Sequence, residues 1–232
     1  MTWKPSELRD KVNNRYGEKQ VQLFEPAMSS FSWKLLIANY HADEHGKIIK
    51  RLLRRQTGSK NERLLKIALN FGSNELVQKN NIDLFTAEAN LIAFAQTLHS
   101  MADILAHIIY YSLSEDSFIP VDEDRISLRY ILEKLKDLPE FSPLKAEIEN
   151  LINLSSFQYL NAYVNTVKHR RLISSNLFTS LIDKKSFGFK IMAFEYRNMS
   201  YNEKNSKDFI EKDRKSIQDA FNKIGNEISN CL

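Results

Sequence analysis

A histidine, two amides and three cations fall within eleven residues of one predicted helix. Asn165 and His169 are four residues apart and Asn161 lies one turn earlier, so the three share a helix face. The cations around the histidine are Lys168, Arg170 and Arg171. Histidine exchanges protons near neutral pH, an amide can hold a ring nitrogen or a substrate oxygen, and cations attract phosphate. The run therefore predicts proton transfer on a phosphate ester. Alternatively, its cations only complement the dipole at a helix C-terminus.

A second group of cations lies on the helix predicted over residues 32–55 and just beyond it. Between Lys47 and Lys66, eight Lys or Arg residues stand against a single acid, Glu62. Such a density can follow a phosphate backbone. The residues expected to do so are Lys47, Lys50, Arg51 and Arg54. The alternative is a solvated helix face that binds nothing.

The same helix contains His41, Glu44 and His45, which match the H-x-x-E-H string of the inverted zincins. Two histidines four residues apart can both bind zinc, and the glutamate can act as a base. A third ligand would have to come from a distant acid such as Glu115. A zinc-dependent hydrolase is therefore a remote alternative. Otherwise these residues face solvent or contact another helix.

The segment from Thr86 to Ser112 is apolar around most of its circumference, which predicts a long central helix with Thr86 as its N-cap. A polar strip interrupts the apolar surface at His99, Asp103 and His107. Polar side chains on a buried helix must form hydrogen bonds or line a cleft. Cleft lining and hydrogen bonding in the core or a dimer interface are equal alternatives, and a metal site is a third.

The segment Val164-Asn165-Thr166-Val167-Lys168-His169 resembles the motif of HEPN-domain proteins, an all-helical family that includes ribonucleases of bacterial defence and toxin–antitoxin systems. The family pattern is an arginine, a polar residue that is often asparagine, a few residues and then histidine. This chain keeps Asn165 and His169, but Val164 stands at the arginine position. In the family, a long helix equivalent to 86–112 faces the motif cleft, which favours cleft lining for its polar strip.

The resemblance implies a metal-independent endoribonuclease that works as a homodimer and needs no cofactor. His169 would be the general acid or base, and Asn165 would orient it or the phosphate. Neighbouring cations would have to replace the missing arginine. Because Val164 removes that arginine, the alternative is a catalytically inactive helical dimer that binds RNA, a nucleotide or a protein partner.

Composition predicts a mainly α-helical fold. The 232 residues include only six Gly and five Pro, too few for the tight turns of a β-sandwich or a Rossmann fold. We expect an extension over residues 1–30, with a loop at 16–30, and one HEPN-like helical domain over 31–232. That domain would include a β-hairpin at about 172–197, with its turn at 184–186, and a C-terminal helix at about 207–230. The apolar face of the 32–55 helix would begin with Trp33, Leu36, Ile37 and Tyr40.

The net charge of +4 permits a nucleic-acid partner without requiring one. A single cysteine, Cys231, excludes an internal disulfide and a thiolate metal cluster. The N-terminus shows no apolar signal core, and no apolar run is expected to reach the length that a membrane span needs. We therefore expect a cytoplasmic protein without a membrane partner.

Overall fold

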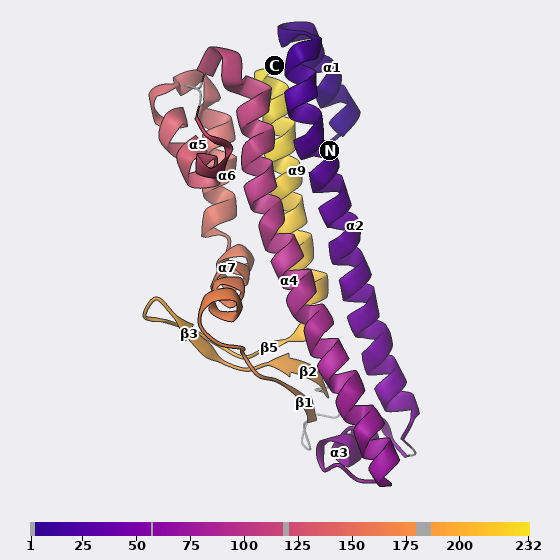
Figure 1. The fold of residues 1–232 in the computed structure, drawn as a ribbon. Helices are drawn as coiled ribbons and strands as arrows, with labels where there is room; N and C mark the ends of the chain where they lie inside the picture. Colours follow the sequence, from indigo (N-terminus) through magenta and orange to yellow (C-terminus); the bar gives the residue numbers. More distant parts are fainter. Residues whose placement is uncertain (1–2, 57, 118–120, 180–186) are drawn as a thin grey trace. The chain divides into compact units, whose positions relative to one another are not determined.

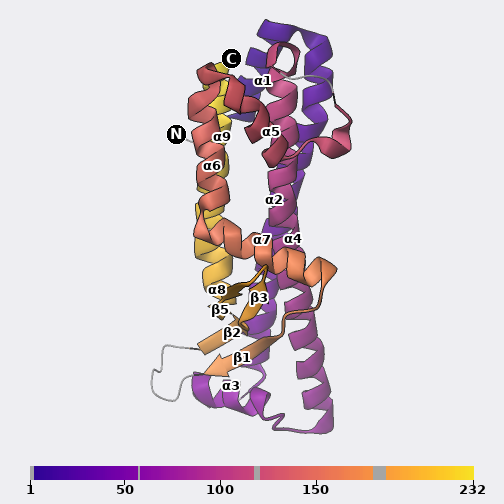
Figure 2. The same ribbon diagram turned by 90° about the vertical axis from the view of Figure 1, so that its left-hand side faces the viewer.

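The computed structural model describes residues 3–56, 58–117, 121–179 and 187–232. It is mainly α-helical, with small antiparallel sheets near the C-terminus (Figure 1, Figure 2). The mainly α class, with strands after the motif helix, is thereby confirmed. The chain divides into two compact units. Unit 1 comprises Met1–Leu36, Thr97–Gln158 and Arg214–Leu232, and unit 2 comprises Ile37–Gln96 and Tyr159–Asp213.

Long helices account for most of the chain. The α-helices are α1 (Pro5–Tyr16), α2 (Glu18–Arg54), α3 (Lys60–Ala68), α4 (Asn74–Ser117), α5 (Leu128–Lys134), α6 (Ser142–Asn153), α7 (Ser155–His169), α8 (Ser206–Asp208) and α9 (Arg214–Cys231). Short 3-10 turns lie at Glu123–Arg125, Leu135–Asp137 and Pro139–Phe141, and a π turn at Phe209–Asp213 joins α8 to α9. Helices α2, α4 and α7 each contribute residues to both units.

Two small sheets follow α7. The first has the order β1-β2-β5, with β1 (Ser175–Thr179) antiparallel to β2 (Phe187–Ile191) and β2 antiparallel to β5 (Lys204–Asn205). The second is a hairpin of β3 (Phe194–Tyr196) and β4 (Met199–Tyr201). The antiparallel pairing expected for 172–197 is present between β1 and β2, and its predicted turn at 184–186 lies outside the described residues.

The core of unit 1 includes α9 packed against α1 and α6. The buried face of α9 repeats at three- and four-residue steps through Ile217, Phe221 and Ile224, as an amphipathic helix requires. Gly225 belongs to this face, and a Cβ added to it would lie 2.1 Å from the ring of the buried Trp3. Glycine at this position therefore makes room for the indole.

The core of unit 2 has two parts. Ile48 and Leu52 of α2 pack with Ile67 of α3 and Ala87 of α4. Tyr163 of α7 meets the rings of Phe194 in β3 and Phe209 in the π turn edge-on, at centroid distances of 6.2 and 5.9 Å. These aromatic contacts fix α7 against the β3–β4 hairpin. The hairpin thereby acquires a defined position beside the motif helix.

Helix α2 differs from the prediction in its start and in its buried face. It begins at Glu18 and continues through Pro26, where a loop was expected. Its buried side chains include the small Ala38 and Ala42. The large apolar residues expected to be buried are exposed instead, by 40–63%: Trp33, Leu36, Ile37 and Tyr40. The first part of the predicted face was therefore wrongly assigned to the core, whereas Ile48 and Leu52, further along the same face, are buried as expected.

Helix α4 starts twelve residues before the predicted N-cap. The Ser73 hydroxyl accepts a hydrogen bond from the Leu76 amide at 3.3 Å, whereas Thr86 lies inside the helix and donates to the Ile82 carbonyl. By length and composition the stretch Asn74–Leu113 could cross a membrane, with a mean hydropathy of 1.3 in its most apolar window. The expectation that no apolar run reaches that length is therefore wrong for this stretch, and 56% of the window is buried inside the protein.

Candidate functional site: an arginine-lined hollow

The hollow lies at the C-terminal end of α7. The amides of Arg170 and Arg171 both donate to the Thr166 carbonyl at 3.0 Å, which ends the helix and turns the chain towards β1. Thr166 is buried, and its hydroxyl donates to the Ala162 carbonyl at 2.8 Å. The backbone of both arginines is thereby anchored, while their side chains are exposed at the surface.

The β3–β4 hairpin supplies the other wall of the hollow. Its two-residue turn consists of Arg197 and Asn198, which have φ angles of 51° and 62°. Positive φ at both positions defines a type I′ turn, for which asparagine and glycine are preferred and arginine is not. Asn198 suits its position, whereas Arg197 occupies a conformation that costs about 1 kcal/mol or more. A strained residue of this kind is a reason to look for function at the turn.

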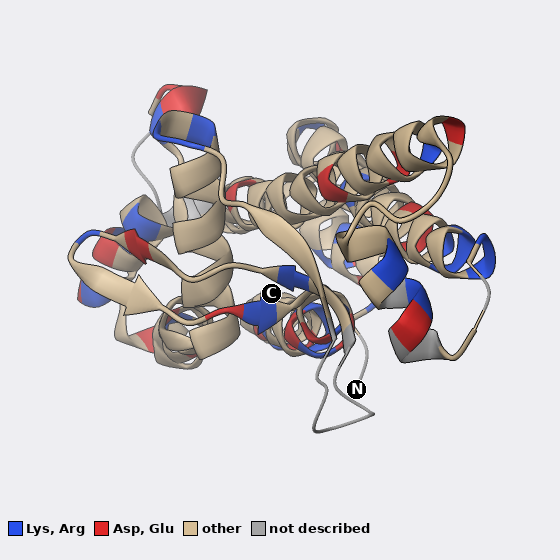
Figure 3. Cartoon of the chain, turned by 90° about the horizontal axis from the view of Figure 1, so that it is seen from below, with Lys and Arg blue, Asp and Glu red and all other residues tan. Residues whose placement is uncertain are grey.

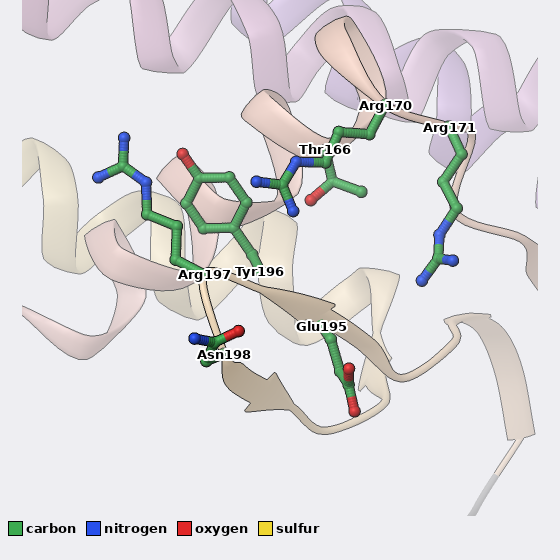
Figure 4. Close-up of a pocket in the computed structure, with 7 residues that line it drawn as sticks. All are labelled: Thr166, Arg170, Arg171, Glu195, Tyr196, Arg197 and Asn198. Carbon is green, nitrogen blue, oxygen red and sulfur yellow. The ribbon is translucent and has the colours of Figure 1, made fainter.

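Tyr196 holds two of the arginines in place. The guanidinium carbon of Arg170 lies 4.9 Å from the centre of the Tyr196 ring, and that of Arg197 lies 5.2 Å from it. Figure 4 shows the ring between the two guanidinium groups. Each cation–π contact contributes about 0.5–1 kcal/mol at an exposed site. The tyrosine is only 9% exposed, so it supports the arginines and offers little surface of its own to a ligand.

The site is cationic overall. The hollow has a volume of about 480 Å³, and its lining residues are Thr166, Arg170, Arg171, Glu195, Tyr196, Arg197 and Asn198. Among the residues that the structure describes, the three arginines form no ion pair. Figure 4 shows the Glu195 carboxylate directed away from Tyr196 and Arg170. Three unpaired guanidinium groups beside one carboxylate make this a site for an anion.

The motif residues differ in their exposure to solvent. His169 and Lys168 are exposed at the end of α7, next to the two arginines of the hollow. Asn165 is half-buried, and its amide donates to the backbone and side-chain oxygens of Asn161 at 2.8 Å, so these N–H groups serve the helix. Val164 is 1% exposed, so the position of the family arginine faces the interior.

The basic stripe of α2 is partly neutralised. Asp83 of α4, itself buried, pairs with Arg51 at 2.6 Å and with Arg55 at 2.7 Å. Lys47 pairs with Glu44 at 2.7 Å. Figure 3 shows acidic and basic positions interspersed along the helices. Within the described part of the chain, Lys50 and Arg54 are the members of the predicted set that form no ion pair.

The proposed zinc ligands are engaged in other contacts. His45 is 3% exposed, and its Nδ1 lies 2.9 Å from the Ala87 carbonyl while its Nε2 lies 2.9 Å from the Ser206 hydroxyl. Burial lowers the pKa of His45 below its ordinary value of 6.5. Nδ1 of His41 meets the Asn90 side chain at 2.9 Å. The Glu115 side chain lies outside the described residues.

The polar strip of α4 belongs to unit 1, whereas His169 belongs to unit 2. His99 is half-buried and stacks on Phe157, with ring centroids 6.2 Å apart. His107 has its ring nitrogens 2.9 and 3.2 Å from the carbonyl oxygens of Asp103 and Glu123. Asp103 itself is exposed. Over the described ranges, no three His, Cys, Asp or Glu side chains are grouped as a metal site.

Sequence reasoning found Arg170 and Arg171 but missed Arg197 and Tyr196. The sequence did contain one sign of this hairpin turn. Asn198, a residue type that tolerates positive φ, follows the alternating apolar residues Phe194 and Tyr196, a pattern typical of a strand that leads into a turn. No family model, curated protein or solved structure matches the chain. The function is therefore argued from the residues and from their geometry.

Proposed function

We propose that the protein binds single-stranded RNA through the arginine-lined hollow. One observation carries the proposal: Arg170 and Arg197 are held against the same tyrosine ring, and Arg171 lines the same hollow, without carboxylate partners among the described residues. A guanidinium group pairs with phosphate through two parallel hydrogen bonds and also stacks on nucleobases. A fixed set of arginines can therefore bind both the phosphates and the bases of a nucleotide chain.

A strand fits this arrangement better than a single small anion. The Tyr196 ring lies between Arg170 and Arg197, so their charges are spread along the site and do not converge on one point. Successive phosphates of a nucleic acid likewise present a row of separate charges. Lys50 and Arg54 are exposed and form no ion pair with any residue that the structure describes, so they are further contacts available in the same unit. The Asn198 amide, which lines the hollow, is a group able to bond a ribose 2′-hydroxyl.

Fluorescence anisotropy with a labelled single-stranded RNA tests the proposal. We expect Arg170→Gln and Arg197→Gln each to weaken binding roughly tenfold or more, because each removes charged hydrogen bonds. For a single strand, the slope of log K against log salt should fall by about 0.7 for each phosphate contact removed. Arg125→Gln is the matched control, since Arg125 is an exposed arginine of unit 1.

Three results would count against RNA binding at this site. The first is wild-type protein that binds no RNA at low salt. The second is equal weakening by Arg125→Gln, which would mean that only net charge matters. The third is equal affinity for DNA of the same sequence, which would remove the role given to the 2′-hydroxyl.

Metal-independent RNA cleavage is the second candidate, favoured by the exposure of His169 directly before Arg170 and Arg171. In this hypothesis a ribose 2′-hydroxyl attacks the adjacent phosphate and the P–O5′ bond breaks, which leaves a cyclic phosphate and a 5′-hydroxyl. His169 either takes the proton of the 2′-hydroxyl or gives one to the leaving 5′-oxygen, and water serves the other transfer. Binding is placed first because Asn165 bonds to Asn161 and Val164 is buried. The test is cleavage of labelled RNA in EDTA by wild type and by His169→Ala. Cyclic phosphate ends made only by the wild type would support catalysis, whereas binding without cleavage would exclude it.

A further inference from the structure

Five large apolar side chains are exposed in a short stretch of unit 2, at α3 and the N-terminal part of α4. Their exposed fractions lie between 42% and 72%, and we name them the α3–α4 patch: Leu65, Leu69, Phe71, Ile82 and Phe85. Single exposed apolar residues need no explanation, but a group of this size usually marks an interaction site. Taking about 200 Å² for each fully exposed side chain, the patch offers roughly 600 Å² of apolar surface.

A hollow of about 560 Å³ lies within the same stretch. Its walls come from α3, α4, β1 and β2, and its lining includes Ile67, Leu84, Phe85, Leu177 and Phe189. Asn70 and Asn81 also line it, and they are the sequence neighbours of Phe71 and Ile82. The patch therefore combines apolar projections with a depression whose lining is partly polar.

The backbone that carries Phe71 is rigid. Helix α3 ends with Asn70 at a φ of 51°, the Phe71 amide donating to the Lys66 carbonyl at 2.7 Å and the Asn70 amide to the Ile67 carbonyl at 3.1 Å. These two bonds form a Schellman motif, in which the apolar residue at this position commonly folds back on the helix. Here the side chain remains 66% exposed. Phe71 is therefore presented to the outside by a fixed turn.

We propose that the α3–α4 patch is the dimer interface of this protein and that its occupant is the same patch of a second copy. An isologous interface needs a surface complementary to itself, and this surface has both projections and a depression. Glu75 and Lys79 beside it pair with each other at 2.5 Å, so a charge available to a second copy is that of Glu88, which forms no ion pair among the described residues. A stable interface buries about 800 Å² per partner with a little over half of it apolar, which the patch can supply.

Glu88 adds a consistent detail. It lines the hollow, and burial raises the pKa of its carboxyl group. Among the described residues no cation pairs with it. A lysine or arginine of the second copy would provide the missing partner. The patch shares no residue with the arginine-lined hollow, so the interface is independent of RNA binding.

Sedimentation velocity of the full chain over a wide concentration series tests the interface. We expect a wild-type dimer whose dissociation constant rises at least about tenfold in Phe71→Ser and in Phe85→Ser. Both side chains are exposed, so circular dichroism should show unchanged folding. Met199→Ser is the matched control, because Met199 is 58% exposed outside the patch. It should leave the dimer unchanged.

Each other outcome would overturn the proposal. A strictly monomeric wild type would remove the interface. A dimer lost in Trp33→Ser but kept in Phe85→Ser would place the interface on the exposed residues of α2. Monomers that sediment with anionic lipid vesicles, and lose this property in Phe85→Ser, would assign the patch to a membrane surface.

Discussion

At the scale of single residues, Val164 bears most directly on catalysis. The motif that the chain resembles needs an arginine there, in contact with the substrate phosphate. The side chain at 164 is instead buried, with 1% of its surface exposed. The position therefore serves packing, and the cations available to a phosphate come from the end of the helix and from the hairpin turn.

Val164→Arg is expected to damage the fold without creating ribonuclease activity. A buried, unpaired guanidinium should lower the free energy of unfolding by roughly 3–5 kcal/mol. Leu172→Arg, at a side chain that is 70% exposed, is the control and should change stability by less than about 0.5 kcal/mol. Urea unfolding of both variants measures the difference. A stable Val164→Arg protein that cleaves RNA would reverse this assignment.

We expect His45 to make the free energy of unfolding fall in acid. Burial lowers its pKa in the folded protein below the ordinary value of 6.5, so the unfolded chain takes up the proton first. Its contribution is therefore complete above pH 6.5 and is lost as pH falls below that value, by up to about 1.4 kcal/mol per pH unit. His45→Gln cannot titrate and should show a shallower dependence of stability on pH between 6.5 and 5. Equal slopes for the two proteins would exclude this role.

At the scale of elements, the spacing of apolar residues predicted the long helices. It did not predict where these helices begin and end, or which of their faces are buried. Pro26 suggested a loop because it breaks one helical hydrogen bond. In α2 the buried side chains on either side, Phe24 and Met28, outweigh that cost. In the first part of α2 the buried residues are the small Ala38 and Ala42, while larger apolar neighbours are exposed. The core face was missed there because the size of an apolar residue does not reveal which side of the helix packs against another helix.

The candidate site was predicted only in part for a similar reason. Arg170 and Arg171 are close in sequence to the motif, so their grouping could be read from spacing. Arg197 reaches them through the folding of a hairpin that begins after two other strands. The pairing of Arg51 and Arg55 with Asp83 was equally hidden, because the acid comes from another helix. Long-range contacts of this kind are set by packing and leave no local pattern.

Replacement of Arg197 in the hairpin turn should stabilise the protein and at the same time weaken RNA binding. Arg197→Asn places a residue that tolerates positive φ at the first turn position but removes the contact with Tyr196, so we expect it to raise the free energy of unfolding by less than about 1 kcal/mol. The same change removes a guanidinium from the hollow and should weaken RNA binding. Thermal unfolding and anisotropy measured on one preparation test both effects. A variant that binds as tightly as wild type would show that Arg197 has no contact with RNA.

At the scale of the whole molecule, the chain passes repeatedly between its two units. Unit 1 takes its residues from three separate segments and unit 2 from two, and α2, α4 and α7 contain three of the passages. Neither unit is therefore a continuous piece of sequence. Each unit is held together by contacts between segments that are far apart along the chain, and contacts of this kind slow folding.

Removal of residues 214–232 should unfold unit 1 even though it deletes only the last helix. Helix α9 packs on α1 and α6 and buries Ile217, Phe221 and Ile224. Without it, the apolar faces of α1 and α6 are exposed to water, at about 25 cal/mol for each Å². Hydrogen exchange should show loss of amide protection in both helices. Protection equal to that of the full chain would mean that α9 is dispensable.

The close approach of Gly225 to Trp3 also bears on the evolution of this chain. The indole occupies the space that any other residue at 225 would need for its Cβ. The two positions are 222 residues apart in sequence, yet a mutation at one limits what the other can become. In homologues, we expect a larger residue at position 225 only where position 3 has lost its tryptophan. An aligned sequence that combines alanine at 225 with tryptophan at 3 would refute this coupling.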